Sequence, residues 1–83
     1  MLTLNDFRTL PFEKKCEFIT FCGNYIAHRK VGDEKIYLYN LGGFFIEVRF
    51  APFQNRVIGI SAFRETNRLK PYYDQVDLTG LGV

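Results

Sequence analysis

Few residues in this 83-residue chain are of types that do chemistry, and a histidine is the first to consider. His28 is the only histidine, and a catalytic histidine needs an orienting carboxylate and a nucleophile within reach. Asp33, Glu34 and Glu47 supply carboxylates, but the expected topology brings no serine or cysteine near them. We therefore expect His28 to lie on the surface of a strand.

Glu47 and Arg49 form a second candidate site, because a carboxylate beside a guanidinium can anchor a polar ligand. The two residues alternate along one expected strand, so their side chains share a face of the sheet. Neighbouring charges of this kind more often neutralise each other, and the sequence therefore favours a simple ion pair between them.

Cys16 and Cys22 are the only cysteines. On a helix, six residues rotate the side chain by about 240° around the axis, which leaves the two thiols about 120° apart and too far for a disulfide unless the helix breaks. A zinc site would need more ligands than two thiols and one histidine. We expect two buried thiols in a reducing compartment, with no metal and no cofactor.

The sequence has no phosphate-binding loop, dinucleotide fingerprint or metal-ligand spacing. Gly42-Gly43 is expected to be a hairpin turn, because no helix follows it to direct N–H groups at a phosphate. The sequence therefore predicts a protein that is not an enzyme, with no catalytic, cofactor-binding or metal-binding residues.

Length and composition limit the function classes further. The chain is long enough for one domain, residues 1–83, and its 47% hydrophobic and 17% aromatic content excludes disorder. A net charge of +2 is too small to indicate nucleic-acid binding by itself. Asp6 stands where a signal peptide needs positive charge, and no apolar run is long enough to cross a membrane. We expect a cytoplasmic protein with no membrane partner.

The elements that position these residues follow from hydrophobic periodicity. Thr3 and Asp6 resemble a capping box that opens a short helical turn. A helix is predicted over Pro11–Cys22, and Gly23 is expected to end it in the left-handed conformation. Its buried face should carry residues at helical spacing: Phe12, Cys16, Ile19 and Cys22.

After Gly23 the period changes to two, which is typical of strands. Four strands are predicted: Tyr25–Lys30, Lys35–Asn40, Phe44–Phe50 and Val57–Arg64. Their short connections favour consecutive antiparallel pairing. A short helix is expected over Pro71–Gln75, with Val76 and Leu78 as candidates to dock the tail. The predicted fold is α+β: an N-terminal helix packed on a four-stranded antiparallel meander, with a short C-terminal helix.

The strand register is predicted by keeping apolar side chains on one face. Leu38 would pair with Ile46, which needs an odd-length loop around Gly42-Gly43 with a left-handed glycine and a bulge. The main helix would then cover six core residues: Ile36, Leu38, Ile46, Val48, Ile58 and Ile60.

With this register the opposite face gathers aromatic side chains around a glutamate and an arginine. The candidate interaction face consists of Tyr37, Tyr39, Phe45, Glu47, Arg49 and Phe63. An uncovered sheet face should be polar, so something is expected to cover this one or to bind it. The sequence leaves three occupants open: the tail helix through Tyr72 or Tyr73, a second copy of the chain, and a ligand or partner.

The sequence thus predicts a non-enzymatic binding or regulatory module that acts through protein contacts, with a partner protein or with itself as a homodimer. The alternative is a single-stranded nucleic-acid binder that stacks bases on the aromatic face and uses Arg49 for phosphates. A plain meander does not interleave helices with strands as the RNA-recognition fold does, and this weakens the alternative. A small-ligand sensor is a third hypothesis.

Several motifs resemble those of short uncharacterised bacterial single-domain proteins. They are Phe44–Phe50, then Pro52, Asn55 and Val57-Ile58, followed by a Phe-Arg pair at Phe63-Arg64 and a Leu-x-Pro-Tyr motif at Leu69–Tyr72. The resemblance extends over nearly the whole chain. It implies one helix followed by a β-meander, and it implies no activity.

Overall fold

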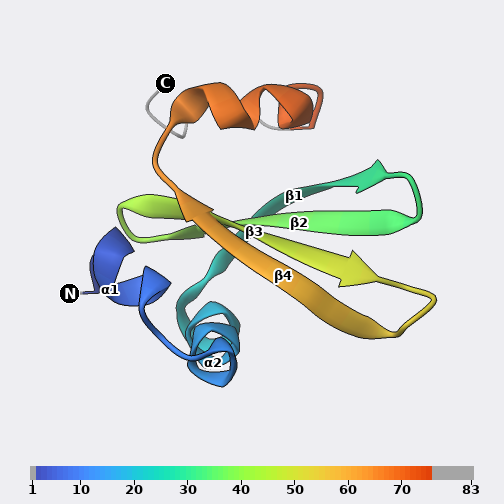
Figure 1. Ribbon diagram of the computed structural model, residues 1–83. Coiled ribbons are helices and arrows are strands. Elements are labelled where there is room, and N and C mark those ends of the chain that lie inside the picture. The colour runs from blue at the N-terminus through green and yellow to red at the C-terminus, as the bar shows by residue number, and fades with distance from the viewer. Residues whose placement is uncertain (1, 76–83) are drawn as a thin grey trace.

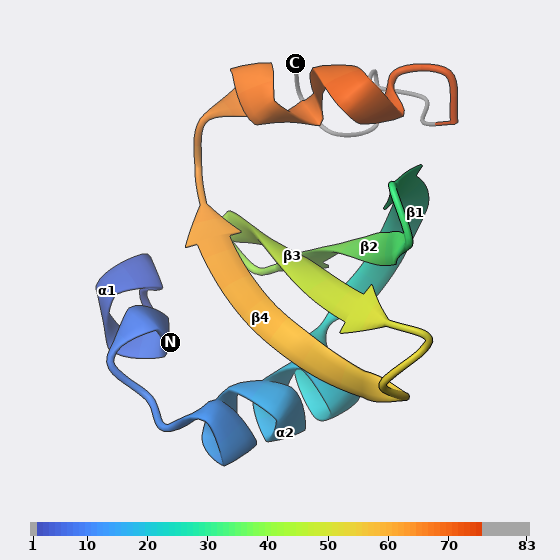
Figure 2. The same cartoon turned by 45° about the vertical axis from the view of Figure 1, so that its right-hand side comes forward.

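The computed structural model describes residues 2–75, which form an antiparallel sheet with helices on both faces. In chain order the elements are α1 (Leu4–Arg8), α2 (Phe12–Cys22), β1 (Asn24–Val31), β2 (Glu34–Leu41), β3 (Phe44–Ala51), β4 (Arg56–Phe63) and the 3₁₀ helix η1 (Thr66–Tyr72). Figures 1 and 2 show α1 and α2 on one side of the sheet and η1 on the other. The predicted α+β class is confirmed. The proposed docking of Val76 and Leu78 lies outside the described residues.

The two N-terminal helices begin and end for identifiable reasons. The capping box is present: Asp6 N–H donates to Thr3 Oγ1 at 3.1 Å, and Thr3 N–H donates to Asp6 Oδ2 at 3.2 Å. α2 ends at Gly23, but with an extended backbone (φ −74°) and not in the left-handed conformation that we expected. A Cβ on Gly23 would lie 2.6 Å from the Ile19 carbonyl oxygen, so close approach is what requires glycine here.

The four strands are confirmed, each within one residue at either end, and they pair in the order β1-β2-β3-β4. The register between β2 and β3 was predicted wrongly: Tyr39, not Leu38, lies opposite Ile46. Gly42 has a φ of 67°, and it closes a two-residue turn with Gly43 instead of an odd-length loop. A shift of one residue turns every β2 side chain to the other face.

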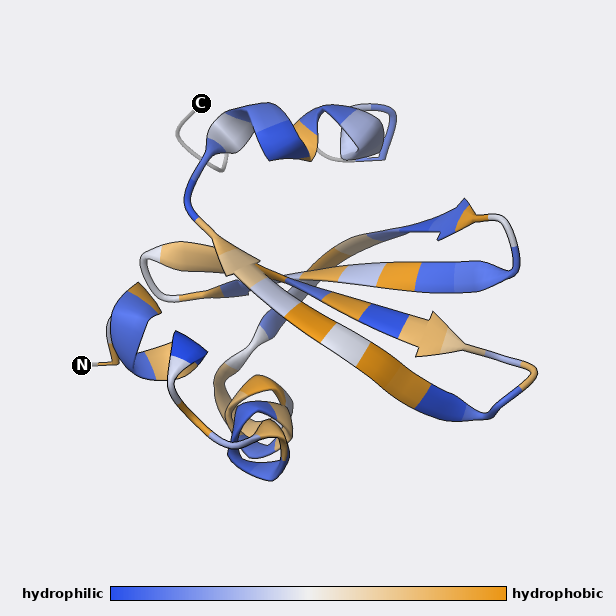
Figure 3. Ribbon diagram, viewed as in Figure 1, coloured by the Kyte–Doolittle hydropathy of each residue, from blue (hydrophilic) through white to orange (hydrophobic). Residues whose placement is uncertain are grey.

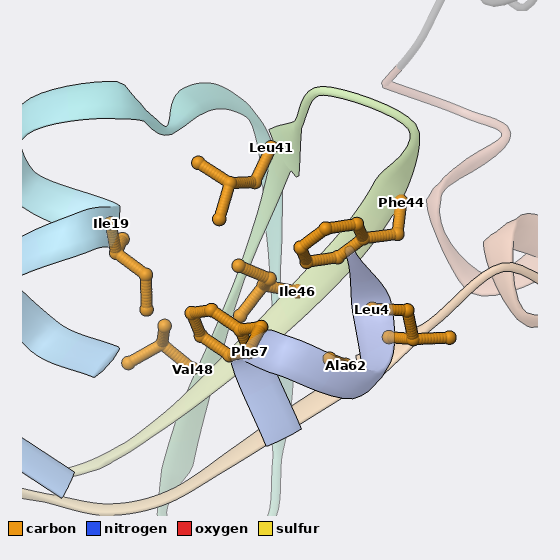
Figure 4. Packing of buried hydrophobic residues seen from close by; sticks show 8 residues of the cluster. All are labelled: Leu4, Phe7, Ile19, Leu41, Phe44, Ile46, Val48 and Ala62. Atoms are coloured by element: carbon orange, nitrogen blue, oxygen red, sulfur yellow. The ribbon is translucent and has the colours of Figure 1, made fainter. Parts of the chain in front are cut away.

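The core under α1 and α2 therefore differs from the predicted one. Figure 4 shows its buried residues: Leu4, Phe7, Ile19, Leu41, Phe44, Ile46, Val48 and Ala62. Ile46 and Val48 are confirmed in it, and Ile60 packs at its margin. Ile36 and Leu38 are buried on the opposite face, while Ile58 is exposed where a bulge interrupts β4.

α1 contributes more to this core than its length suggested. The Phe7 and Phe44 rings lie 5.7 Å apart, between α1 and the sheet. α2 buries only Ile19, so Cys16 is half-buried and Cys22 is exposed. The prediction of two buried thiols was wrong, because α1 occupies sheet surface that we had assigned to the main helix.

A second core lies between the sheet and η1. Its buried residues are Ala27, Leu38, Phe63, Leu69 and Tyr72. The C-terminal helix begins at Thr66 and not at Pro71 as predicted. A 3₁₀ helix has three residues per turn, so Leu69 and Tyr72 lie on the same side and both pack on the sheet. The tail therefore covers part of the face whose occupant the sequence left open.

Candidate functional site

The predicted interaction face is divided between the two sides of the sheet. Tyr37 pairs with Val48 and Tyr39 pairs with Ile46, which places both tyrosines on the face covered by α1 and α2. Phe45, Glu47, Arg49 and Phe63 share the face covered by η1, as the alternation along β3 and β4 requires. The six side chains therefore do not form one aromatic surface, and the cause is the register error in β2.

The expected pairing of Phe45 with Phe63 is confirmed. The two residues are opposite each other on β3 and β4, and their rings stack with centroids 5.7 Å apart. Tyr39 does not flank Phe45, because its side chain points to the other face. Phe63 is fully buried against Leu69 and Tyr72 of η1, so no ligand can stack on its ring.

Glu47 is the centre of the polar part of this face. Glu47 is only 7% exposed, and three side chains donate hydrogen bonds to its carboxylate. The Tyr72 hydroxyl donates to Oε2 at 2.6 Å, Arg29 Nη2 donates to Oε2 at 3.3 Å, and Arg68 Nη2 donates to Oε1 at 2.8 Å. The predicted ion pair between Glu47 and Arg49 was wrong, since Arg49 instead binds Glu34 through Nε at 3.1 Å and Nη2 at 2.8 Å.

These contacts set the protonation states at the centre of the site. Desolvation favours the neutral acid, but the hydrogen bonds from Tyr72, Arg68 and Arg29 outweigh it and hold the pKa of Glu47 below its ordinary value. Desolvation, assisted by the hydrogen bond to Glu47, raises the pKa of Tyr72 to about 12. At neutral pH Glu47 is therefore a carboxylate and Tyr72 a neutral donor.

Aromatic rings hold two of the arginines in place. The Arg68 guanidinium lies over the Phe63 ring, with Cζ 3.9 Å from the ring centroid. The Arg29 guanidinium lies over the Tyr72 ring at 5.5 Å. Each guanidinium is thus fixed on one side by a ring and along one edge by Glu47.

A cleft opens beside η1, where the 3₁₀ helix no longer covers the sheet. Ile36 of β2 pairs with Arg29 of β1 on one side and with Arg49 of β3 on the other, so the two arginines flank it. The cavity measures about 290 Å³ and is lined by Arg29, Val31, Ile36, Glu47, Arg49, Ser61 and Arg68. Three guanidiniums from three different elements therefore line a cleft that also contains the Glu47 carboxylate.

No family model, curated protein or solved structure matches the chain. Within residues 2–75, no three histidine, cysteine, aspartate or glutamate side chains lie together as metal ligands would. None of the helices in this range has the length and apolar character needed to cross a membrane. His28 is exposed on β1 as predicted, and its Nδ1 lies 2.7 Å from the Tyr25 hydroxyl.

Sequence reasoning missed two of the three arginines. A signal for Arg68 was present in the sequence, because basic residues outnumber acidic ones between Arg49 and Lys70. Arg29 gave no signal, because its neighbours across the sheet depend on the register of β2. Tyr72 was named as a residue that could cover the face, but its hydrogen bond to Glu47 needed the path of η1 to be known.

Proposed function

We propose that the protein is a non-enzymatic binding module that associates with a second copy of itself through the outer edge of β4. One observation carries the proposal: from Val57 to Ser61 the outer edge of β4 carries no charge and no side chain of the described residues bonds to its backbone, whereas the outer edge of β1 is blocked by a side chain. The sheet order leaves β1 and β4 as its two edges. Edge strands present unpaired backbone groups that can pair with another chain.

The edge of β1 is blocked near its middle by Gln75. The Gln75 side-chain amide donates from Nε2 to the His28 carbonyl oxygen. Its Oε1 accepts from the His28 backbone N–H at 3.3 Å. One side chain therefore satisfies both backbone groups of His28, and an incoming strand could pair there only by displacing it.

The edge of β4 has little such protection. The seven residues from Val57 to Phe63 include no charge and no proline, and Figure 3 shows the apolar character of this strand after Arg56. Protective edge strands usually carry lysine, other charges or proline. Among the side chains of the described residues, only Arg8 donates to the β4 backbone, at the Ala62 carbonyl oxygen (2.8 Å) near the end of the strand.

A second copy is the occupant that this edge fits best. Two β4 strands that pair antiparallel about a two-fold axis would present the same surface to each other and join the two sheets into one. The pairing would also cover the exposed Ile58 and the half-buried Val57 and Ile60 beside the seam. The net charge of +2 is small and offers little repulsion between copies.

The nucleic-acid alternative has less support from this geometry. It needs exposed aromatic rings on one face, whereas η1 covers Phe63, and Tyr37 and Tyr39 lie on the opposite face. Phe53 in the β3–β4 turn is exposed, but isolated apolar side chains are common on protein surfaces. The exposed Tyr25 packs edge-on against Tyr39, with ring centroids 5.8 Å apart.

The test is the mass in solution of three versions of the chain, measured by light scattering after size exclusion. The wild type should have twice the mass of one chain, and Ile58→Lys should be monomeric with an unchanged melting temperature, because a charge on the seam opposes strand pairing. Val31→Lys is the matched control, since Val31 on the other edge strand is 43% exposed and Ile58 is 39% exposed. A monomeric wild type, or an Ile58→Lys variant that stays dimeric, would refute the proposal.

A further inference from the structure

We propose that the cleft formed by Arg29, Arg49 and Arg68 binds the phosphoryl group of a small phosphate ester. This inference does not depend on the association through β4, because the cleft is built from side chains of a single copy. It rests on charge, on unused hydrogen-bond donors, on side chains that are already held in place, and on an apolar wall beside the charged one.

The charges of the cleft do not cancel. Within residues 2–75, three guanidiniums, which stay charged at any physiological pH, meet two carboxylates. Glu47 is shared between Arg29 and Arg68, and Glu34 pairs with Arg49. One positive charge is left over in a cavity where part of each guanidinium is accessible. An anion that binds in the cleft would neutralise this remaining positive charge.

The arginines retain donors for such an anion. Each guanidinium has five N–H groups, but to the described residues Arg29 donates one hydrogen bond, from Nη2 to Glu47. Arg29 Nε also has no hydrogen-bond partner among the described residues, but it is buried and is therefore not a donor that an anion in the cleft could reach. Arg68 uses Nη2 for both Glu47 and Ser61, and the other nitrogens of its fork have no acceptor within residues 2–75. Planar forks of this kind match the oxygens of a phosphoryl group.

The site is assembled before any ligand arrives. Arg68 lies on the Phe63 ring and Arg29 on the Tyr72 ring, while Glu47 holds both guanidiniums along one edge. Binding would therefore order few side chains, which removes a cost that flexible surface arginines incur. Glu47 acts in this arrangement as a positioning residue and does not contact the anion.

The other wall of the cleft indicates the rest of the ligand. Val31 and Ile36 line it with apolar side chains, next to the charged groups. A volume of about 290 Å³ lies at the lower end of the range for small-molecule sites. It accommodates a phosphoryl group with one compact apolar substituent. Phenyl phosphate is accordingly the probe of choice, with inorganic phosphate and benzoate for comparison.

The experiment is a titration of the ¹⁵N-labelled full chain, followed by NMR. Phenyl phosphate should produce saturable shifts at Arg49, Ser61 and Arg68, with a higher affinity than inorganic phosphate and benzoate. Arg49→Gln should weaken binding about tenfold or more, because it removes a charge-assisted contact. Arg56→Gln is the matched control: it removes the same charge, but Arg56 contacts Gln54 and lies outside the cleft.

Several outcomes would overturn the proposal. One is a titration with phenyl phosphate that does not saturate, and another is an equal loss of affinity in Arg49→Gln and Arg56→Gln. The proposal would also fail if benzoate bound as tightly as phenyl phosphate, or if an oligouridylate strand bound more tightly than phenyl phosphate at the same residues. Thermal melting of each variant establishes that the fold is intact. Ile58→Lys should bind phenyl phosphate like the wild type, so failure of the cleft and failure of the β4 interface are distinguishable.

Discussion

The Tyr72 hydroxyl donates to Glu47 Oε2 at 2.6 Å, and this bond joins η1 to β3. The Tyr72 ring belongs to the apolar cluster between η1 and the sheet. Tyr72 is fully buried and Glu47 nearly so, although Glu47 is charged. A buried carboxylate is tolerated only when donors compensate for the lost hydration. Here two of those donors, Tyr72 and Arg68, come from η1, and the third, Arg29, comes from β1. Both arginines line the cleft. The packing of η1 and the geometry of the cleft are thus coupled through one side chain.

The first prediction concerns that bond. Tyr72→Phe keeps the ring in the apolar cluster but removes one donor to a buried charge, which should lower the free energy of unfolding by about 1.5–3 kcal/mol. Urea denaturation measures the change. Tyr73→Phe is the control, because Tyr73 is exposed and should be neutral. Equal midpoints for wild type and Tyr72→Phe would mean that the bond does not stabilise the packing of η1.

Much of this fold could be predicted from the sequence, because its signals are local. The capping box at Thr3, the helix that ends at Gly23 and the four strands depend on short-range periodicity and turn chemistry. The register between β2 and β3 depends on the turn alone, and Gly42-Gly43 fits both a two-residue turn and a longer bulged loop. The apolar alternation favoured the longer bulged loop, because that register places Ile36 and Leu38 on the same face as Ile46, whereas the structure places the tyrosines of β2 there.

The candidate site was less predictable for the same reason. Arg29, Glu47 and Arg68 lie far apart in the sequence and meet only through the register of β2 and the path of η1. Buried glutamates are rare, and a glutamate two residues before an arginine on one strand was most simply interpreted as its partner in an ion pair. The sequence could indicate that this face needs a cover, but not that the cover would carry donors for Glu47.

The second prediction concerns pH. Because the folded state holds the pKa of Glu47 below its ordinary value of 4.5, the carboxylate stabilises the fold above that pH. This contribution should be lost as the pH falls through the lower, folded-state pKa. Glu47→Gln lacks the contribution, so the difference in stability between wild type and variant should be constant near neutral pH and shrink in acid. Urea denaturation across the acid range measures it, and a constant difference would contradict the assignment.

The third prediction tests the first core. Ile19 is the one buried residue of α2, so Ile19→Ala should lower the free energy of unfolding by about 2–5 kcal/mol. Phe21→Ala is the control on the same helix, because Phe21 is 83% exposed and its loss should change stability by less than about 0.5 kcal/mol. If thermal melting ranks the two variants in the opposite order, α2 does not face the sheet as described.

The fourth prediction distinguishes the sheet face covered by η1 from the outer edge of β4. Phe45 is half-buried, stacks on Phe63 and packs against the cluster under η1. Phe45→Glu places a second carboxylate in the cluster beside Glu47 and should therefore destabilise the fold by more than about 2 kcal/mol. Because Phe45 lies under the tail and not at the seam, the folded fraction should keep the mass of the wild type. Ile58→Lys should do the reverse, with a changed mass and unchanged melting. Circular dichroism melting and light scattering on both variants measure the stability and the mass. A Phe45→Glu variant that melts like the wild type but changes its mass would mean that η1 leaves this face open to a partner.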